Sequence, residues 1–465
     1  METFDVIVIG AGPAGENMAG RCTECDATIA VVEAELVGGE CSYWACEPSK
    51  ALLRPGEVLA EAARVPGAAS AMSGALDVRA ALDRRDHIVS HWNDEPQARW
   101  LDGAGATLVR GHGRLVGARR VDVELADGSV RELEATKAVV LATGSSAVIP
   151  PIDGLRDTRV WGSRDATSAQ EVPERFVVLG GGVVGVELAQ AWKRLGAREV
   201  TVIEAAPRLV ANLEPFAGEQ LAAAFTAEGI DVRTGVKAVG VHRADGPDSP
   251  VTVTLEDGTE VTGDELLVAV GRRPNTGDIG LDTVGLEPGK PVPTDDQLRA
   301  AGVDGSWLYA IGDCNGRTLL THMGKYQARI AVDVILRDAL ATAWADRRVV
   351  PSVVFTDPQI ASVGLTERAA REQGIDVRVV EHGTGDVAGA HARGVGITGT
   401  SRLVIDEERR VVVGATFTGP GVAEMIHAAT IAIVAEVPVD TLWHAVPVFP
   451  TVSEVWLRLL EAYGL

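Results

Sequence analysis

The stretch FDVIVIGAGPAGENMAGR, residues 4–21, decides the fold. Its apolar run, residues 6–9, is typical of a strand buried on both faces of a parallel sheet. Three glycines in G-x-G-x-x-G spacing follow at Gly10, Gly12 and Gly15, and they lead into a helix-like segment. Such glycines permit a tight turn, a close approach of the backbone to a pyrophosphate, and close helix–strand packing. The stretch therefore predicts a dinucleotide-binding turn.

The same pattern returns in RFVVLGGGVVGVELAQAWKRLG at 175–196. Its three glycines are Gly180, Gly182 and Gly185. In both copies a second apolar strand ends in an acid, Glu33 and Glu204, about 20 residues after the first glycine, where a carboxylate can bind ribose hydroxyls. One copy alone is a weak signal, because many α/β proteins contain a glycine turn. Two complete copies predict two dinucleotide sites.

The acid of the second copy indicates which nicotinamide cofactor is used. Glu204 beside the adenine ribose would repel a 2′-phosphate, and the next residues are Ala205 and Ala206 rather than arginines. Arg208 is close enough in sequence to reach back. We therefore expect a preference for NADH, with NADPH the less favoured cofactor.

Composition limits the possible partners. The net charge of -22, spread along the chain, disfavours nucleic acid and anionic membranes as partners. The N-terminus lacks the basic region of a signal peptide, and no apolar run reaches about 18 residues. Five cysteines, an odd number, do not suit a disulfide scaffold. These features predict a cytoplasmic protein without membrane insertion.

The order of motifs predicts an α/β protein with two Rossmann-like dinucleotide-binding domains and a C-terminal α+β domain. The first domain is discontinuous and takes residues 1–150 and 272–345, and the second takes 151–271. From 346 to 465 the chain changes to β-rich segments with turns, closed by helical segments.

The segment CSYWACEPSK, residues 41–50, places Cys41 and Cys46 five positions apart. Five residues of helix rise about 7.5 Å, whereas the Cα atoms of a disulfide lie within about 7 Å. A bridged pair therefore cannot share one regular helix, and Gly38 and Gly39 offer an irregular entry. A metal site would need further Cys or His ligands, which the segment lacks, so we predict no metal. A redox pair and two inert core thiols remain as alternatives.

Over essentially its whole length the sequence resembles the two-dinucleotide flavoprotein disulfide reductases, which include lipoamide dehydrogenase, glutathione reductase and mercuric reductase. The motifs that carry the resemblance occur in family order. They are GAGPAG with Glu33, GGECSYWACEPSK, LATGS at 141–145, GGGVVGVE with Glu204, GRRPN at 271–275, IGDC at 311–314, FTDPQIASVGLTE at 355–367 and FPTVSE at 449–454.

The resemblance implies FAD on the first copy, NAD(P)H on the second, and a homodimer formed through the C-terminal domain. Asp313 would bind the ribityl chain, and a helix starting near His322 and Met323 would point its positive end at the flavin. The residues implied for FAD are Gly10, Gly12, Gly15, Glu33, Lys50, Thr143, Gly144, Asp313, His322 and Met323. Those implied for NAD are Gly180, Gly182, Gly185, Glu204 and Gly271.

By the same resemblance, Cys41 and Cys46 form the redox disulfide. Cys46 is the thiol nearest the flavin and forms a charge-transfer thiolate, while Cys41 attacks the substrate. Lys50 lies near the flavin and pairs with Glu187. A helix N-terminus and Lys50 nearby would lower the thiol pKa.

Three other features of the thiol chemistry have a plain structural interpretation. Glu47 stands where the family has an apolar residue, and we interpret it as a solvated carboxylate; the alternative is that it raises the thiol pKa or disfavours anionic substrates. Cys22 and Cys25, at the expected end of the first helix, and Cys314 are interpreted as packing residues.

The family's disulfide-reducing members end in His-Pro-Thr-x-Ser-Glu, and that histidine is the acid/base for the attacking thiol. Here Phe449 takes the histidine position, and Glu454 has no imidazole to orient. A phenyl ring cannot transfer a proton, and loss of a positioned acid/base costs about 10²–10⁴-fold in rate. His444 could replace it only after a loop rearrangement, so we interpret it as a surface or interface residue.

We therefore expect an NADH-oxidising, FAD-dependent enzyme that passes electrons through Cys41 and Cys46 to a small-molecule acceptor, such as a quinone or another electrophile. A special low-molecular-weight disulfide and a lipoamide dehydrogenase-like activity are alternatives. A redox-sensing flavoprotein is a further alternative, disfavoured by the complete nicotinamide motif. Mercuric reductases carry a C-terminal cysteine pair, whereas here no cysteine follows Cys314. Mercury is therefore disfavoured as the substrate.

Overall fold

The computed structural model describes residues 1–244, 246 and 249–465. The chain forms two compact units, each built from separate stretches of sequence. The first unit comprises 1–48, 86–148 and 271–347, and the second comprises 49–85, 149–270 and 348–465.

A seven-stranded sheet organises the first unit, with strand order β3-β2-β1-β6-β5-β4 and β16 added beside β6. The strands are β1 (Glu2–Ile9), β2 (Ile29–Glu33), β3 (Thr107–Arg110), β4 (His112–Leu115), β5 (Arg120–Glu124), β6 (Val130–Leu141) and β16 (Leu308–Ala310). The pairings of β1, β2, β3 and β16 are parallel, whereas β4 and β5 pair antiparallel. The predicted strand at 6–9 is confirmed and begins four residues earlier, at Glu2.

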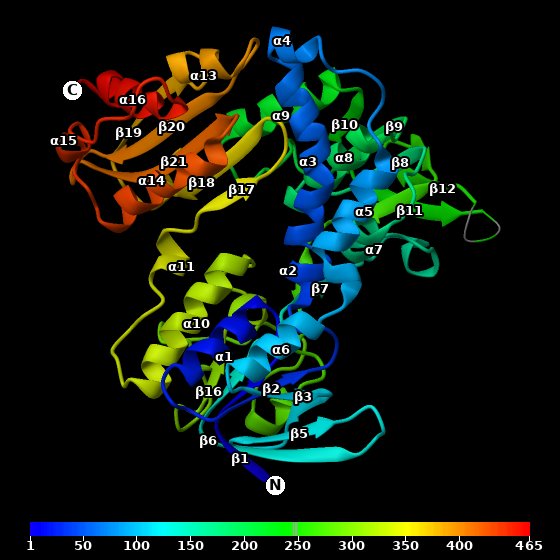
Figure 1. Cartoon of the computed structure of the whole chain (residues 1–465), viewed down its shortest axis with the longest axis vertical. Coiled ribbons are helices and arrows are strands. Elements are labelled where there is room, and N and C mark those ends of the chain that lie inside the picture. Colours follow the sequence, from blue (N-terminus) through cyan, green and yellow to red (C-terminus); the bar gives the residue numbers. More distant parts are fainter. Residues whose placement is uncertain (245, 247–248) are drawn as a thin grey trace. The chain divides into compact units, whose positions relative to one another are not determined.

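Both faces of β1 are buried, as its apolar run predicted. Val6 and Val8 pack against α1 (Pro13–Thr23) and α10 (Thr321–Leu336), whereas Ile7 and Ile9 pack against β4 and β5. Figure 1 shows α1, α10 and β1 in the same region of the first unit. Other elements of this unit include α2 (Gly39–Tyr43), α6 (Glu95–Gly103), β7 (Ser145–Ala147) and β15 (Arg272–Pro274).

The second unit contains a four-stranded parallel sheet of order β10-β9-β8-β14 and an antiparallel three-stranded sheet of order β11-β12-β13. Their strands are β8 (Arg175–Leu179), β9 (Glu199–Glu204), β10 (Ile230–Thr234), β11 (Ala238–Arg243), β12 (Val251–Leu255), β13 (Glu260–Gly263) and β14 (Glu265–Val268). Helices α7 (Ser163–Ser168), α8 (Val183–Leu195) and α9 (Pro215–Ala227) accompany them. The motif at 175–196 thus forms strand, turn and helix, as predicted.

An antiparallel five-stranded sheet of order β17-β18-β21-β20-β19 occupies the C-terminal part of the second unit. Its strands are β17 (Ser352–Val354), β18 (Gln359–Gly364), β19 (Val377–Gly383), β20 (Thr400–Asp406) and β21 (Val411–Gly419). The helices here are α12 (Glu367–Glu372), α13 (Ala388–Arg393), α14 (Val422–Val434), α15 (Val439–Leu442) and α16 (Val455–Tyr463). Helix α14 lies along β18 and β21 (Figure 1), and their apolar side chains form one core with α16. The C-terminal segment is therefore α+β, as predicted.

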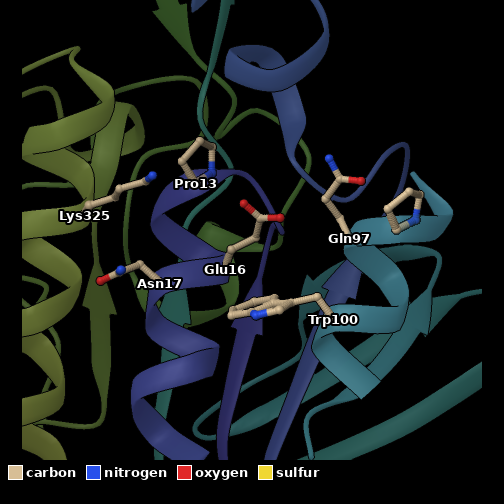
Figure 2. Close-up of a pocket in the computed structure, with 7 residues that line it drawn as sticks. Pro13, Glu16, Asn17, Gln97, Trp100 and Lys325 are labelled. Atoms are coloured by element: carbon tan, nitrogen blue, oxygen red, sulfur yellow. The ribbon is translucent and has the colours of Figure 1, made fainter. Parts of the chain in front are cut away.

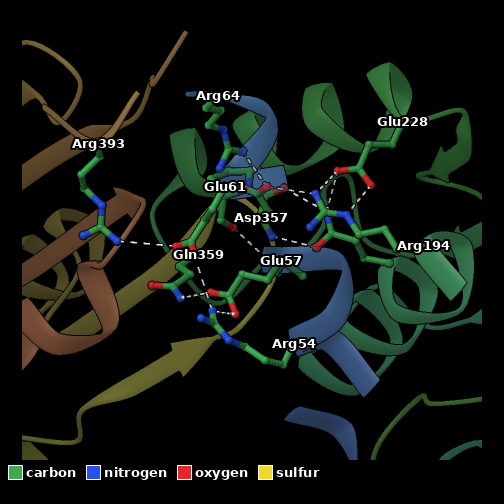
Figure 3. A network of polar contacts seen from close by, with 12 residues as sticks. Arg54, Glu57, Glu61, Arg64, Arg194, Glu228, Asp357, Gln359 and Arg393 are labelled. Atoms are coloured by element: carbon green, nitrogen blue, oxygen red, sulfur yellow. Dashed lines mark hydrogen bonds and ion pairs between the residues drawn. The ribbon is translucent and has the colours of Figure 1, made fainter. Parts of the chain in front are cut away.

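A network of ion pairs joins three parts of the second unit (Figure 3). Asp357, in the turn between β17 and β18, accepts hydrogen bonds from Arg64 at 2.6 Å and Arg194 at 2.9 Å. Arg194 on α8 also binds Glu228. Arg64 lies just after α3 (Cys46–Ala63), so the network fixes that helix end and the β17–β18 turn against α8.

Candidate active site

The first glycine turn leaves room for a phosphate group. Gly10 has φ +104°, and a Cβ there would lie 2.4 Å from the carbonyl oxygen of Ala142. A Cβ on Gly15 would lie 2.0 Å from the oxygen of Gly10, so neither position accepts a side chain. Gly12 precedes α1 and has nothing within 4 Å of a Cβ position. The unpaired N–H groups of the helix N-terminus therefore face open space, which fits a pyrophosphate.

The acid of the first motif is held by the backbone of the turn. Glu33 accepts hydrogen bonds from the N–H groups of Ala11 and Glu35, both at 2.7 Å. Burial raises the pKa of Glu33, and these two hydrogen bonds oppose the shift. The carboxylate is thus oriented before any ribose reaches it.

The second motif repeats this arrangement. Gly180 has φ +113°, with a Cβ position 2.4 Å from the oxygen of Ala269, and Gly182 again borders open space. Glu204 accepts hydrogen bonds from the N–H groups of Gly181 at 2.5 Å and Ala206 at 2.6 Å. The guanidinium of Arg208 donates to the oxygen of Ala211 at 2.9 Å. The residues of this turn fit a second dinucleotide.

A hydrogen-bonded group in the first unit fixes Asp313. The Ser145 hydroxyl donates to Asp313 at 2.5 Å, and Arg272 donates to the same hydroxyl at 2.7 Å. Burial raises the pKa of Asp313, and the Ser145 hydrogen bond opposes the shift. Asn275 holds the segment before Ser145, through the backbone oxygens of Thr143 and Gly144.

The predicted NAD residues are divided between the units. Gly271 lies in the first unit, whereas Gly180, Gly182, Gly185 and Glu204 lie in the second. Gly271 has φ +143°, and its oxygen accepts the N–H of Val148 at 3.0 Å.

Cys41 and Cys46 lie on separate helices. Cys41 is in α2, which follows Gly38 at φ +111°, and Cys46 is the first residue of α3. This confirms that the pair does not share one regular helix. None of the five cysteines, all of which are described, is in a disulfide. Cys46 Sγ lies 3.5 Å from Oγ1 of Thr321, the first residue of α10, so this helix N-terminus meets the dithiol.

The structure corrects the prediction of a lowered thiol pKa for Cys41. Hydrogen bonding to Cys46 and burial raise the pKa of Cys41 above its ordinary value, while a hydrogen bond with Thr321 opposes the shift. A neighbouring thiol favours the protonated form, and burial disfavours a thiolate.

Lys50 and Glu187 form the predicted ion pair, with Nζ 2.7 Å from Oε2. The other carboxylate oxygen, Oε1, accepts the N–H of Phe355 at 2.9 Å. Lys50 Nζ also lies 4.9 Å from the centre of the Phe355 ring. Glu187 is 3% exposed, so its charge depends on these partners.

The Phe449 side chain is 72% exposed. One oxygen of Glu454, Oε1, accepts a hydrogen bond from Arg458 at 2.6 Å. The second oxygen, Oε2, is buried without a hydrogen-bond partner. His444 is exposed, and Glu454 accepts its hydrogen bond from Arg458 instead.

The remaining candidates take the places expected from their positions. Helix α10 begins at Thr321, so His322 and Met323 lie in its first turn, and Glu47 is exposed in the first turn of α3. Cys22 and Cys314 are fully buried, and burial raises the pKa of both thiols to about 12. These two thiols therefore pack as inert core residues.

Sequence reasoning missed two features. The first is Thr321, which precedes the predicted His322 and contacts Cys46. The second is a cavity of about 390 Å³ beside α1, α6 and α10 (Figure 2). Its lining residues are Pro13, Glu16, Asn17, Pro96, Gln97, Trp100 and Lys325. They come from three distant stretches of the sequence. The one signal for this cavity that the sequence offered was Glu16, an acid in the helix that follows the first glycine motif.

Comparison with known proteins identifies the family. Residues 4–329 match the model of the pyridine nucleotide-disulphide oxidoreductases, and residues 350–459 match their dimerisation domain. The chain belongs to this family. The predicted resemblance is confirmed, and with it an oxidoreductase that uses FAD and NAD(P)H. The dimerisation domain supports the predicted homodimer.

Individual family members cover the whole chain. A dihydrolipoyl dehydrogenase of Pseudomonas aeruginosa is 34% identical over 98% of this chain and 96% of its own. A mercuric reductase of Staphylococcus aureus is 30% identical over 97% of this chain and 81% of its own. The structure of LpdA from Mycobacterium tuberculosis is similar over 100% of both chains, with TM-score 0.86 and 25% identity. The flavoprotein disulfide reductase RclA of Escherichia coli shares the fold, with TM-score 0.86 over 99% of both chains and 23% identity.

Two further observations concern the described residues only. No helix among them is both long and apolar enough to cross a membrane. They contain no group of three or more His, Cys, Asp or Glu side chains placed to hold a metal ion.

Proposed function

We propose that this family member takes hydride from NADH and reduces a quinone-like or other electrophilic small molecule through bound FAD and the Cys41–Cys46 dithiol. The observation that carries the proposal is Phe449, which stands where disulfide-reducing relatives have their acid/base histidine. A phenyl ring cannot protonate a leaving thiolate, so exchange with ordinary disulfides loses about 10²–10⁴-fold in rate. Reduction of a quinone releases no thiolate, so it does not need this protonation.

The chain offers a complete route for the electrons. We propose that Gly10, Gly12, Gly15 and Glu33, with Asp313, hold FAD, which when bound would accept hydride and supply electrons to the Cys41–Cys46 disulfide. The N-terminus of α10 places a partial positive charge beside Cys46. The Thr321 hydroxyl lies within hydrogen-bond distance of Cys46 Sγ. Lys50, neutralised by Glu187, is the cation that we propose to lie near the flavin.

NADH is the proposed cofactor of the second motif. Two backbone N–H groups hold the Glu204 carboxylate at the place where a 2′-phosphate would stand. Arg208 is engaged with the oxygen of Ala211, which supports the preference against NADPH.

Further proposals concern the organisation of the enzyme. We propose an FAD domain at 1–150 and 272–345, an NAD domain at 151–271, and a homodimer interface at 346–465. Exposed apolar side chains at Val446, Val448 and Phe449 support an interface in the last segment. We also propose a cytoplasmic location, because five cysteines, an odd number, do not suit a disulfide scaffold.

Lipoamide dehydrogenase activity is the second candidate, favoured by the 34% identical dihydrolipoyl dehydrogenase and by the intact cysteine pair. Phe449 counts against it. The mercuric reductase relative raises mercury as a substrate, but no cysteine follows Cys314. A special low-molecular-weight disulfide and a redox-sensing role are the remaining alternatives.

The test compares acceptors under one set of conditions. The holoenzyme is assayed with NADH and menadione, with NADH and lipoamide, and in reverse with NAD and dihydrolipoamide. The proposal expects fast menadione reduction and slow lipoamide chemistry. Rapid oxidation of dihydrolipoamide would instead establish the second candidate. A parallel anaerobic NADH titration should take up four electrons per FAD if the dithiol is in redox contact with the flavin.

A further inference from the structure

The cavity beside α1, α6 and α10 is a place for a small molecule in the first unit. Its volume of about 390 Å³ lies in the range of small-molecule sites. Its lining residues include none of those expected to bind FAD or NAD. The lining is therefore separate from the residues assigned to the two cofactors.

Two features link the helices that line the cavity to the elements around the dithiol. Thr321 on α10 contacts Cys46, and Lys325, which lines the cavity, follows one turn later on the same helix face. A Cβ on Gly39, at the start of α2, would lie 2.9 Å from the Cα of Gly12. Helix α2, which carries Cys41, therefore begins against the start of α1, which carries the cavity residue Glu16.

The lining combines an aromatic face with a few polar groups. Trp100 is 49% exposed and offers its ring for stacking, while Lys325 is a hydrogen-bond donor. Gln97 Oε1 is buried and has no hydrogen-bond partner, so it can accept from a ligand hydroxyl. Figure 2 shows the Glu16 carboxylate reaching from α1 toward the side of Gln97. A planar ring with oxygens at its edge suits these groups.

Glu16 is suited to proton transfer near neutral pH. Burial raises its pKa to about 7, while the charge of Lys325 on α10 opposes the shift and that of Glu33 on β2 adds to it. Tyr43 on α2 is a further titratable neighbour: burial raises the pKa of Tyr43 to about 12, and the charges of Asp94 and Glu16 add to the shift. An acid that is half-protonated near pH 7 can both give and regain a proton.

We propose that this cavity binds the quinone acceptor and that Glu16 is the catalytic acid that protonates a quinone oxygen. The inference rests on the proposed quinone reduction. It assigns to Glu16 the protonation of a quinone oxygen, which is a different step from the protonation of a leaving thiolate that Phe449 cannot perform. Trp100 stacks on the quinone ring, Lys325 donates to one oxygen, and Gln97 accepts from the hydroxyl that forms.

The step balances. The quinone gains two electrons and two protons and becomes the hydroquinone, while Cys41 and Cys46 lose two electrons and two protons and close to a disulfide. Glu16 gives one proton to a quinone oxygen and regains one released by the dithiol. The second proton is exchanged through solvent. NADH and one proton then reduce the disulfide again.

The test uses three holoenzymes, namely wild type, Glu16→Gln, and Glu24→Gln as the control at the exposed end of the same helix. Each is assayed with NADH and menadione between about pH 5.5 and 9, and with ferricyanide, which accepts one electron and needs no proton. We expect Glu16→Gln to lose about 10²-fold in menadione kcat/KM at pH 6. We expect the wild-type rate to fall above pH 7 and the Glu16→Gln rate not to show this fall. Ferricyanide turnover should equal that of wild type. Trp100→Leu should raise the KM for menadione alone.

The other outcomes overturn the inference in distinguishable ways. If wild type does not reduce menadione, the proposed function fails and the inference fails with it. If wild type is active and Glu16→Gln matches it, the function stands and only the role of Glu16 is wrong. Equal losses with menadione and ferricyanide would indicate general damage and also exclude a specific acid.

Discussion

Lys50 Nζ lies 2.7 Å from Glu187 Oε2, and this ion pair joins α3 to α8, the helix of the second glycine motif. Glu187 also accepts the N–H of Phe355, so both oxygens of a 3% exposed carboxylate have partners. A buried carboxylate remains charged without a large penalty only while such partners are present.

Lys50→Met should therefore destabilise the holoenzyme by about 1–3 kcal/mol, because it leaves a buried charge with one partner. The double variant Lys50→Met/Glu187→Gln should recover much of this loss, since a neutral amide still accepts from Phe355. Urea denaturation measures both. Lys193→Met, which removes only a bond to the Arg198 carbonyl, is the control. Strictly additive effects would mean that the two side chains are not coupled.

Thr321→Val should shift the reactivity of the dithiol. The Thr321 hydroxyl lies 3.5 Å from Cys46 Sγ and lowers the pKa of Cys41. Losing a hydrogen bond of about 1 kcal/mol should move the pH midpoint of alkylation upward by about 0.5–1 unit. Iodoacetamide labelling of the reduced enzyme, followed peptide by peptide, gives the midpoint. Thr107→Val in β3 should leave it unchanged.

Phe449→His should restore a proton donor for thiol exchange. Oε2 of Glu454 is buried without a partner and is available to orient an imidazole. We expect dihydrolipoamide oxidation by NAD to rise by about 10²-fold, the lower end for a positioned acid/base. Phe449→Leu provides the matched control with no titratable group. A histidine variant no faster than the leucine variant would show that Phe449 does not limit this reaction.

Glu204→Gln should weaken the discrimination between NADH and NADPH. Removing one negative charge beside the 2′-phosphate position should reduce the free-energy difference between binding of the two cofactors by on the order of 1 kcal/mol. The ratio of kcat/KM for the two cofactors should then change by about fivefold, measured with ferricyanide as acceptor. Glu199→Gln, at the exposed start of β9, should not alter it. An unchanged ratio in Glu204→Gln would place the determinant elsewhere.

Glu16 should make stability depend on pH. Its pKa is about 7 in the folded protein and about 4.5 unfolded, so between these values the folded state binds more protons. Stability from this group is therefore present below pH 4.5 and lost as pH rises through 7. At pH 8, Glu16→Gln should melt about 2–4 °C above wild type, and the gap should close toward pH 5. A gap that is independent of pH would contradict the raised pKa.

Local chemistry in the sequence was enough for the architecture and the cofactor motifs. Gly10 and Gly180 mark turns that no other residue can make, and the apolar runs after Asp5 and Arg175 read as buried strands because both faces are covered. The same local reasoning separated Cys41 from Cys46, since helix rise and disulfide reach are fixed quantities.

Contacts between distant segments decided the rest. The pKa of Cys41 is raised because Cys46 and burial act on it, whereas the sequence shows only the helix N-terminus and Lys50 nearby. Glu16 reads as an ordinary helix carboxylate until α6 and α10 enclose it beside Trp100 and Lys325. Desolvation depends on what surrounds a group in space, and neighbours some 80 and 300 residues away along the chain become neighbours in space only through folding.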